Sequence, residues 1–78
     1  MYREPVRSKS VASIDYNDLS DTLEIEFRNG SVYRYFDVPE ETYAELMAAS
    51  SIGRYVNYRI KPYFPYERIV KEYKKTKK

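Results

Sequence analysis

Hydrophobic and polar residues alternate along the first half of the chain, a pattern typical of strands that bury one face. The alternation occurs in VASIDY (11–16), TLEIEF (22–27) and SVYRYF (31–36). In the first of these segments it places Ala12 on the buried side and both Ser13 and Asp15 on the solvent side. Short polar segments separate the three runs, so the pattern predicts a three-stranded antiparallel meander.

The connection Arg-Asn-Gly (28–30) sets which face of the last strand is buried, because side chains alternate strictly along a strand. A two-residue loop would place Arg34 opposite Ile25, among the apolar side chains. A three-residue loop, with Gly30 in a bulge, would instead place Tyr33 opposite Ile25. The two registers therefore predict opposite surroundings for the tyrosines of the last strand.

The three-residue loop gives the better cross-strand partners. It pairs Leu23 with Tyr35, and it places the carboxylate of Glu24 across from the guanidinium of Arg34. Each favourable cross-strand pair contributes about 0.2–1 kcal/mol, whereas the other register would direct an arginine toward the core. The sequence favours the three-residue loop, in which Tyr33 and Tyr35 are mainly core residues.

After residue 38 the apolar spacing changes to three and four residues, which predicts helices. Pro39 suits the first turn of one helix, and Ser51 caps a second helix that ends at Pro62. Residues 66–73 fit either a short amphipathic helix or a terminal strand. The predicted fold is therefore α+β, with a three-stranded antiparallel meander followed by two helices and a short C-terminal element. The expected buried stripes of the helices are Tyr43, Leu46 and Met47 in the first and Ile52, Tyr55, Val56 and Ile60 in the second.

The 78 residues leave room for one domain, and a chain of this length buries only about 60% of its unfolded surface. There is no cysteine, so disulfides cannot add stability, and the ten tyrosines must supply much of the core volume. We expect a disordered N-terminal arm over residues 1–8, the folded domain over residues 9–70 and a basic tail over residues 71–78.

The net charge of +2 is unevenly distributed. Residues 1–10 carry +2, residues 11–50 carry −7 and residues 51–78, the C-terminal third, carry +7. Two solvated faces and a frayed lysine tail would account for this distribution. Alternatively, the C-terminal third contacts an anion.

These segments resemble the KTSC domain, named for its occurrence at the C-terminus of some lysyl-tRNA synthetases and also found as a small stand-alone bacterial protein. The similarity covers residues 9–70, and its most specific part is VYRYFDVP (32–39), supported by TLEIEF and SIGRYVNYRI. Where the family tends to have aspartate after the tyrosine of the first strand, Asn17 follows Tyr16 here, and both residue types suit a turn. The resemblance implies no active site and an unassigned function for which RNA binding is suggested. The family's central Tyr-x-Tyr motif matches Tyr33, Arg34 and Tyr35, for which a mainly structural role is implied.

The residue types argue against catalysis. Without histidine or cysteine, the chain cannot build a nucleophilic triad, a thiolate or a histidine-held metal site. Glu24 and Glu26 lie on one strand face, which is the ordinary solvent side of an amphipathic strand. Gly30 and Gly53 are the only glycines, so there is no glycine-rich phosphate loop. We expect no enzyme activity, no cofactor and no metal site.

The C-terminal third interleaves basic and aromatic residues, a combination that suits nucleic-acid binding. Cations neutralise phosphates, and aromatic rings stack on unpaired bases. The pI of 8.8 is modest and the acidic half would repel a long duplex, which favours weak contact with single-stranded RNA. The predicted binding residues are Arg54, Tyr58, Arg59, Lys61, Tyr63 and Arg68, followed by an electrostatic tail of Lys71, Lys74, Lys75, Lys77 and Lys78.

The same features also suit a protein–protein interaction module. Exposed aromatic residues, an open sheet edge and an asymmetric charge can dock onto a protein partner or a second copy. The N-terminal residues contain no apolar run, and no segment approaches the length of a membrane span. We therefore expect a cytoplasmic location and no membrane association.

Overall fold

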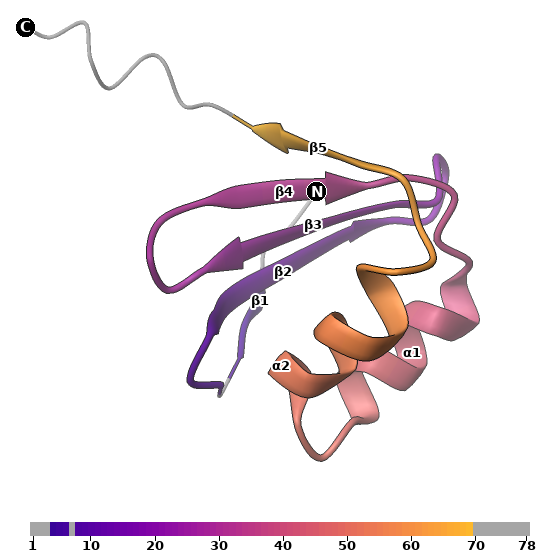
Figure 1. Cartoon of the computed structure of the whole chain (residues 1–78). Helices are drawn as coiled ribbons and strands as arrows, with labels where there is room; N and C mark the ends of the chain where they lie inside the picture. Colours follow the sequence, from indigo (N-terminus) through magenta and orange to yellow (C-terminus); the bar gives the residue numbers. More distant parts are fainter. Residues whose placement is uncertain (1–3, 7, 70–78) are drawn as a thin grey trace, which may run out of the picture.

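The computed structural model describes residues 4–6 and 8–69. It forms a five-stranded antiparallel sheet with helices packed against one face, as Figure 1 shows. Each strand pairs with the next one along the chain, in the order β1-β2-β3-β4-β5, and the predicted α+β class is confirmed. The elements are β1 (Glu4–Pro5), β2 (Val11–Asn17), β3 (Thr22–Phe27), β4 (Val32–Tyr35), α1 (Glu40–Ala48), α2 (Ile52–Tyr55), the π-helical turn η1 (Val56–Ile60) and β5 (Tyr66–Ile69).

The β3–β4 hairpin has the register predicted for the three-residue loop. Leu23 lies opposite Tyr35, and the backbone N–H of Phe27 donates to the carbonyl of Ser31 at 2.8 Å. Gly30 has a φ of 95°, in the left-handed region that glycine enters without steric cost. The cross-strand pairing preferences therefore identified the correct register.

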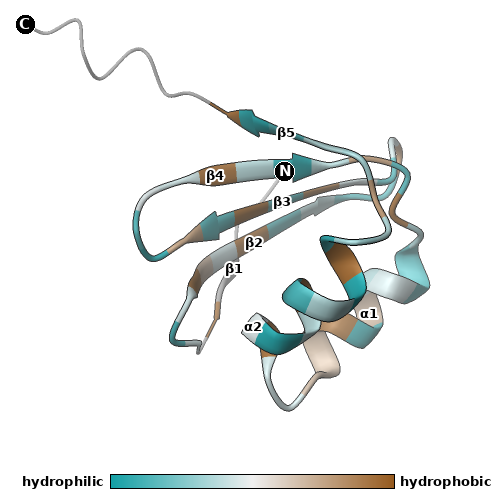
Figure 2. Ribbon diagram, in the orientation of Figure 1, coloured by the Kyte–Doolittle hydropathy of each residue, from teal (hydrophilic) through white to brown (hydrophobic). Residues whose placement is uncertain are grey.

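The hydrophobic core lies between the helices and the sheet face that they cover. Tyr35 is its largest fully buried side chain, with 1% exposed, while Tyr33 is partly buried and packs against the core. The expectation that both are mainly core residues is thus met by Tyr35 and in part by Tyr33. Figure 2 shows apolar positions interspersed with hydrophilic ones on the strands and helices, as amphipathic elements require. The buried cluster comprises Val11, Ile14, Leu23, Ile25, Tyr35, Val38, Leu46, Val56 and Ile60.

Strand β2 departs from simple alternation. A register shift between Val11 and Ser13 lets Val11 take the buried position that alternation assigned to Ala12, which is only partly buried. Ser13 and Asp15 were expected on the solvent side, but each is only 8% exposed. The Ser13 hydroxyl donates to a carboxylate oxygen of Glu26 at 2.8 Å, and β2 is flanked by strands on both sides, which cover short side chains.

The ends of the domain also differ from the prediction. Glu4–Pro5 pairs with β2, so part of the expected disordered arm over residues 1–8 is an ordered strand. The C-terminal element is the strand β5, which satisfies the backbone groups along the edge of β4. These two strands extend the predicted three-stranded meander to five strands. The second helix is not uniform, because α2 passes into η1, and the predicted tail over residues 71–78 lies outside the described residues.

Gly53 packs against the segment that precedes β2. A Cβ atom added at Gly53 would lie 2.5 Å from the hydroxyl oxygen of Ser10 but 3.8 Å from its Cβ. In a Ser10→Ala background, we expect Gly53→Ala to raise the free energy of unfolding by about 0.5–1 kcal/mol, the helix-propensity difference. In the wild-type background the hydroxyl must move, so the gain should be smaller. Urea denaturation of the four proteins measures both gains, and equal gains would contradict this packing.

Candidate nucleic-acid interface

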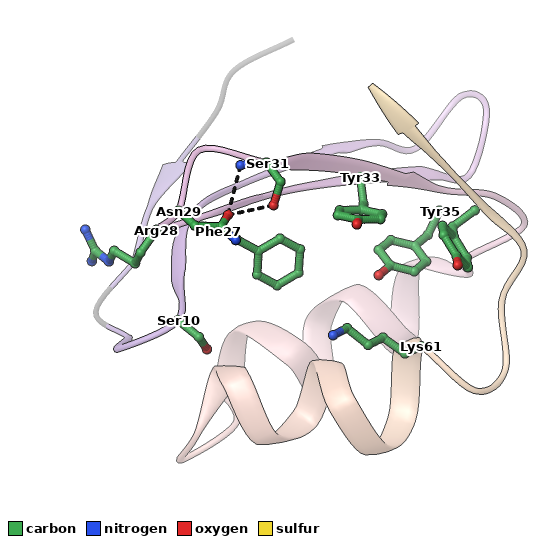
Figure 3. A pocket seen from close by; sticks show the side chains of 9 residues that line it. Ser10, Phe27, Arg28, Asn29, Ser31, Tyr33, Tyr35 and Lys61 are labelled. Carbon is green, nitrogen blue, oxygen red and sulfur yellow. Dashed lines mark hydrogen bonds between the residues drawn. The ribbon is translucent and has the colours of Figure 1, made fainter. Parts of the chain in front are cut away.

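A cavity of about 580 Å³ opens where the β3–β4 hairpin, β5 and the turn after η1 meet. Figure 3 shows it from close by, with the sheet on one side and the helices on the other. Because aromatic side chains make up much of its wall, we call it the aromatic cavity. Its lining residues are Ser10, Phe27, Arg28, Asn29, Ser31, Tyr33, Tyr35, Lys61 and Tyr66.

Four aromatic rings, each in contact with at least one other, form the apolar wall. Phe27 and Tyr33 meet edge to face, with ring centroids 5.7 Å apart and an interplanar angle of 82°. The centroid of the Tyr66 ring lies 5.6 Å from the ring centroids of both Tyr33 and Tyr35. Burial, followed by the neighbouring hydroxyls of Tyr33 and Tyr66, raises the pKa of Tyr35 to about 12. Tyr66 is 58% exposed, so part of the aromatic surface is accessible to a ligand.

Lys61 supplies positive charge to this cavity. Its Nζ lies 5.4 Å from the centroid of the Phe27 ring, and Figure 3 shows the side chain reaching from the helix toward that ring. Arg28 also lines the cavity, but its guanidinium donates to the carbonyls of Val6 (3.2 Å) and Ser8 (3.1 Å) and is turned away in Figure 3. None of the described residues that line the cavity carries a carboxylate, so an anion there would meet the positive charge of Lys61.

Polar side chains lie at the hairpin end of the cavity. The side-chain carbonyl oxygen of Asn29 accepts hydrogen bonds from the Ser31 N–H (3.0 Å) and hydroxyl (2.7 Å), drawn as dashed lines in Figure 3. This arrangement fixes the orientation of the amide and leaves its nitrogen as a donor. Together with the Ser10 hydroxyl, the cavity therefore offers hydrogen-bonding groups beside its aromatic wall.

Three grooves continue from the aromatic cavity around α2 and η1. The first groove shares Ser10 with the cavity. Arg54 and Tyr58 line both the first and the second groove. Tyr55 and Arg59 line both the second and the third groove. The four depressions are thus linked by common lining residues, and we call the whole series the groove path.

All six predicted binding residues are exposed, and five of them line the groove path. Lys61 lines the aromatic cavity, and Arg68 lies opposite Tyr33 in the β4–β5 pairing, so it points to the same face of the sheet. Arg68 is not among the described residues that line the four depressions. The other four predicted residues line the grooves around α2 and η1: Arg54, Tyr58, Arg59 and Tyr63.

Sequence reasoning missed two aromatic residues of the cavity, Phe27 and Tyr66. Phe27 is the last apolar residue of β3, and alternation alone does not show whether such a residue is covered. Tyr66 faces the cavity because β5 is a strand paired in register with β4, which places it opposite Tyr35. The sequence could therefore have indicated this position for Tyr66 only if residues 66–73 had been predicted as a strand rather than a helix.

Arg34 lies on the sheet face that points away from the helices. Its Nε and Nη2 donate to one carboxylate oxygen of Glu24 at 3.0 and 2.8 Å, and its Nη1 donates to Glu67 at 3.3 Å. The arginine thereby joins β3, β4 and β5 through side-chain contacts. Asp15 lies opposite Glu24 and Ser13 opposite Glu26 in the β2–β3 pairing, so acidic side chains predominate on this outer face.

Within residues 4–6 and 8–69, no three or more acidic side chains come together in a way that could hold a metal ion. In the same part of the chain, no helix has the length and apolar character needed to cross a membrane.

The KTSC domain family model matches residues 7–64 of the chain. A KTSC domain protein from Yersinia pestis, known from its crystal structure, is similar with a TM-score of 0.84 and 38% identity over 88% of this chain and 97% of that one. An uncharacterized protein from Stutzerimonas stutzeri is 40% identical over 70 residues, which are 88% of this chain and 99% of that protein.

Larger proteins also contain a related segment. A lysine–tRNA ligase from Trichormus variabilis is 44% identical over 54 residues, which are 69% of this chain but only 10% of the ligase. The related segment is therefore a small part of the ligase, while it makes up nearly all of the Stutzerimonas protein. None of these matches indicates a catalytic family for the shared segment.

Proposed function

The chain belongs to the KTSC domain family, and on this premise we propose that it is a non-catalytic domain that binds single-stranded RNA weakly through its C-terminal third and the aromatic cavity. The groove path is the main observation that supports this proposal. It is a series of linked depressions rather than one isolated pocket, and each is lined by both cationic and aromatic side chains, together with the carboxylate of Glu45 in the third groove. A flexible strand can follow such a path, with phosphates near cations and bases near rings.

The exposure of the aromatic residues supports this proposal. Tyr58, Tyr63 and Tyr66 are 67%, 68% and 58% exposed, although a tyrosine ring is large and mostly apolar. Each lies within a few residues of an exposed cation, such as Arg59 beside Tyr58. Aromatic rings beside cations offer stacking on unpaired bases together with neutralisation of phosphates.

The distribution of charge also supports it. The outer face of the sheet carries Glu24, Glu26 and Glu67, with Arg34 already engaged by two of these carboxylates. RNA would therefore be repelled from the outer face. On the opposite side α1 carries the exposed Glu40, Glu41 and Glu45, so RNA would be attracted to the grooves around α2 and η1, where Arg54 and Arg59 lie. The domain would present one RNA-binding side, which suits a short single strand better than a long duplex that extends past both faces.

The lysine–tRNA ligases that contain a related segment act on RNA by their name, which agrees with a role beside RNA. We extend this context to the present chain only as part of the proposal, together with a cytoplasmic location, where such RNA is found. Docking onto a protein is the competing function, and the first experiment separates the two.

Fluorescence anisotropy with a labelled single-stranded RNA of about ten nucleotides tests the proposal. We expect saturable binding at low salt, and weaker binding to a duplex of the same length, because paired bases cannot stack on the exposed tyrosines. Equal affinity for the single strand and the duplex would show that the interaction is non-specific charge attraction without base stacking. No binding to either at low salt would leave the protein–protein interaction module as the better explanation.

A further inference from the structure

We infer that the aromatic cavity receives one unpaired nucleotide, with its base against the tyrosine rings and its phosphate at Lys61. This inference rests on the proposed RNA binding and adds to it a distinct subsite. It predicts recognition of a whole nucleotide at one position, whereas the grooves around α2 and η1 would only track the strand. The chemical class recognised is a nucleoside monophosphate, either free or as one residue of an RNA strand.

The size and lining of the cavity fit this ligand class. Its volume of about 580 Å³ falls within the range of roughly 300–1,000 Å³ that is usual for small-molecule sites. The ring of Tyr66 contacts those of Tyr33 and Tyr35 along one wall, and the exposed part of Tyr66 is available for stacking. A flat, partly apolar ligand therefore gains more here than a flexible aliphatic one.

The charge of the cavity indicates an anionic ligand. Within residues 4–6 and 8–69, no carboxylate forms an ion pair with Lys61. The ammonium group of Lys61 lies over the ring of Phe27. Lys61 is exposed, and a phosphate would contact its ammonium group without displacing a salt bridge from a described residue. An ammonium ligand would be repelled, so the aromatic wall does not form a cage for a cation.

Hydrogen-bonding groups complete the match. The Asn29 amide nitrogen and the Ser10 hydroxyl can contact the edge of a base or a ribose hydroxyl. Ser10 also lines the adjoining groove, which contains Arg54 and Tyr58. A strand that leaves the cavity past Ser10 would thus bring its next phosphate toward a second cation.

Calorimetric titration of the full chain with AMP, with adenosine and with the short single-stranded RNA tests the inference. We expect AMP to bind more tightly than adenosine and to compete with the RNA. Tyr66→Ala should weaken AMP binding by about tenfold or more, as the loss of one stacking contact does. Lys61→Gln should abolish the preference for AMP over adenosine.

Tyr58→Ala is the matched control, because Tyr58 is 67% exposed, against 58% for Tyr66, but lies outside the cavity. It should leave AMP binding unchanged while it weakens RNA binding. If RNA binds but AMP neither binds nor competes, or if Tyr66→Ala and Lys61→Gln behave like Tyr58→Ala, the nucleotide subsite is wrong and the proposed function stands. If neither RNA nor AMP binds, the proposed function itself fails. Thermal melting of each variant shows that it remains folded.

Discussion

Tyr35→Ala should lower the free energy of unfolding by about 3 kcal/mol or more, the usual cost of truncating a buried aromatic side chain to alanine. Tyr35 is 1% exposed and lies opposite Leu23 within the buried cluster. Folded domains are stable by only about 5–15 kcal/mol, and a short chain lies toward the lower end. Urea denaturation followed by circular dichroism measures the loss.

Tyr58→Ala is the control for this prediction, because it removes the same side chain from a position that is 67% exposed. Its effect on stability should stay within about 0.5 kcal/mol, as is usual for surface substitutions. Tyr35→Phe separates the ring from the hydroxyl and should retain most of the stability. A loss below about 1 kcal/mol for Tyr35→Ala would contradict the placement of this ring in the core.

Replacement of Arg54, Arg59 and Lys61 by alanine should have the largest effect on RNA binding. If the wild-type chain neutralises about four phosphates, the logarithm of its affinity should fall with the logarithm of salt concentration at a slope near −3, at about 0.7 per phosphate. Loss of three cations should reduce that slope to about −1 and weaken binding by about 100-fold or more at low salt. Fluorescence anisotropy at several salt concentrations gives both quantities.

A charge-conserving triple variant, with Arg54→Lys, Arg59→Lys and Lys61→Arg, controls for the loss of positive charge. It should keep the wild-type slope, because the slope reports the number of neutralised phosphates rather than the shape of the cations. Tyr58→Ala should likewise keep the slope while it weakens binding by the free energy of one stacking contact, about 1–3 kcal/mol. An alanine triple variant that binds with unchanged affinity and slope would exclude these residues from the interface.

The hairpin register could be predicted because its determinants are local in the sequence. Leu23 and Tyr35 face each other across a three-residue connection, and so do Glu24 and Arg34. The alternative register would have placed Arg34 among apolar side chains, at a cost larger than any gain from its own pairs. Few possibilities compete within a hairpin, so pairing preferences were sufficient to decide between them.

The aromatic cavity could not be predicted in the same way. Phe27 and Tyr33 come from the hairpin, whereas Lys61 and Tyr66 come from the C-terminal third and meet them only when β5 pairs with β4. The sequence around Tyr66 fitted both a helix and a strand, and the edge of β4, a tertiary feature, selected the strand. The bulge in β2 escaped prediction for a similar reason, because it depends on how Val11 and Ser13 meet the neighbouring strand.

A nuclear magnetic resonance titration of the full chain with a short single-stranded RNA tests the central claim most directly. We expect the largest shifts on the ring signals of Tyr58 and Tyr66 and on the amide signals around Lys61. Signals of the outer sheet face, such as those of Glu24 and Glu26, should remain unchanged at the same RNA concentration. Shifts confined to the outer face, or no shifts at low salt, would contradict RNA binding along the groove path.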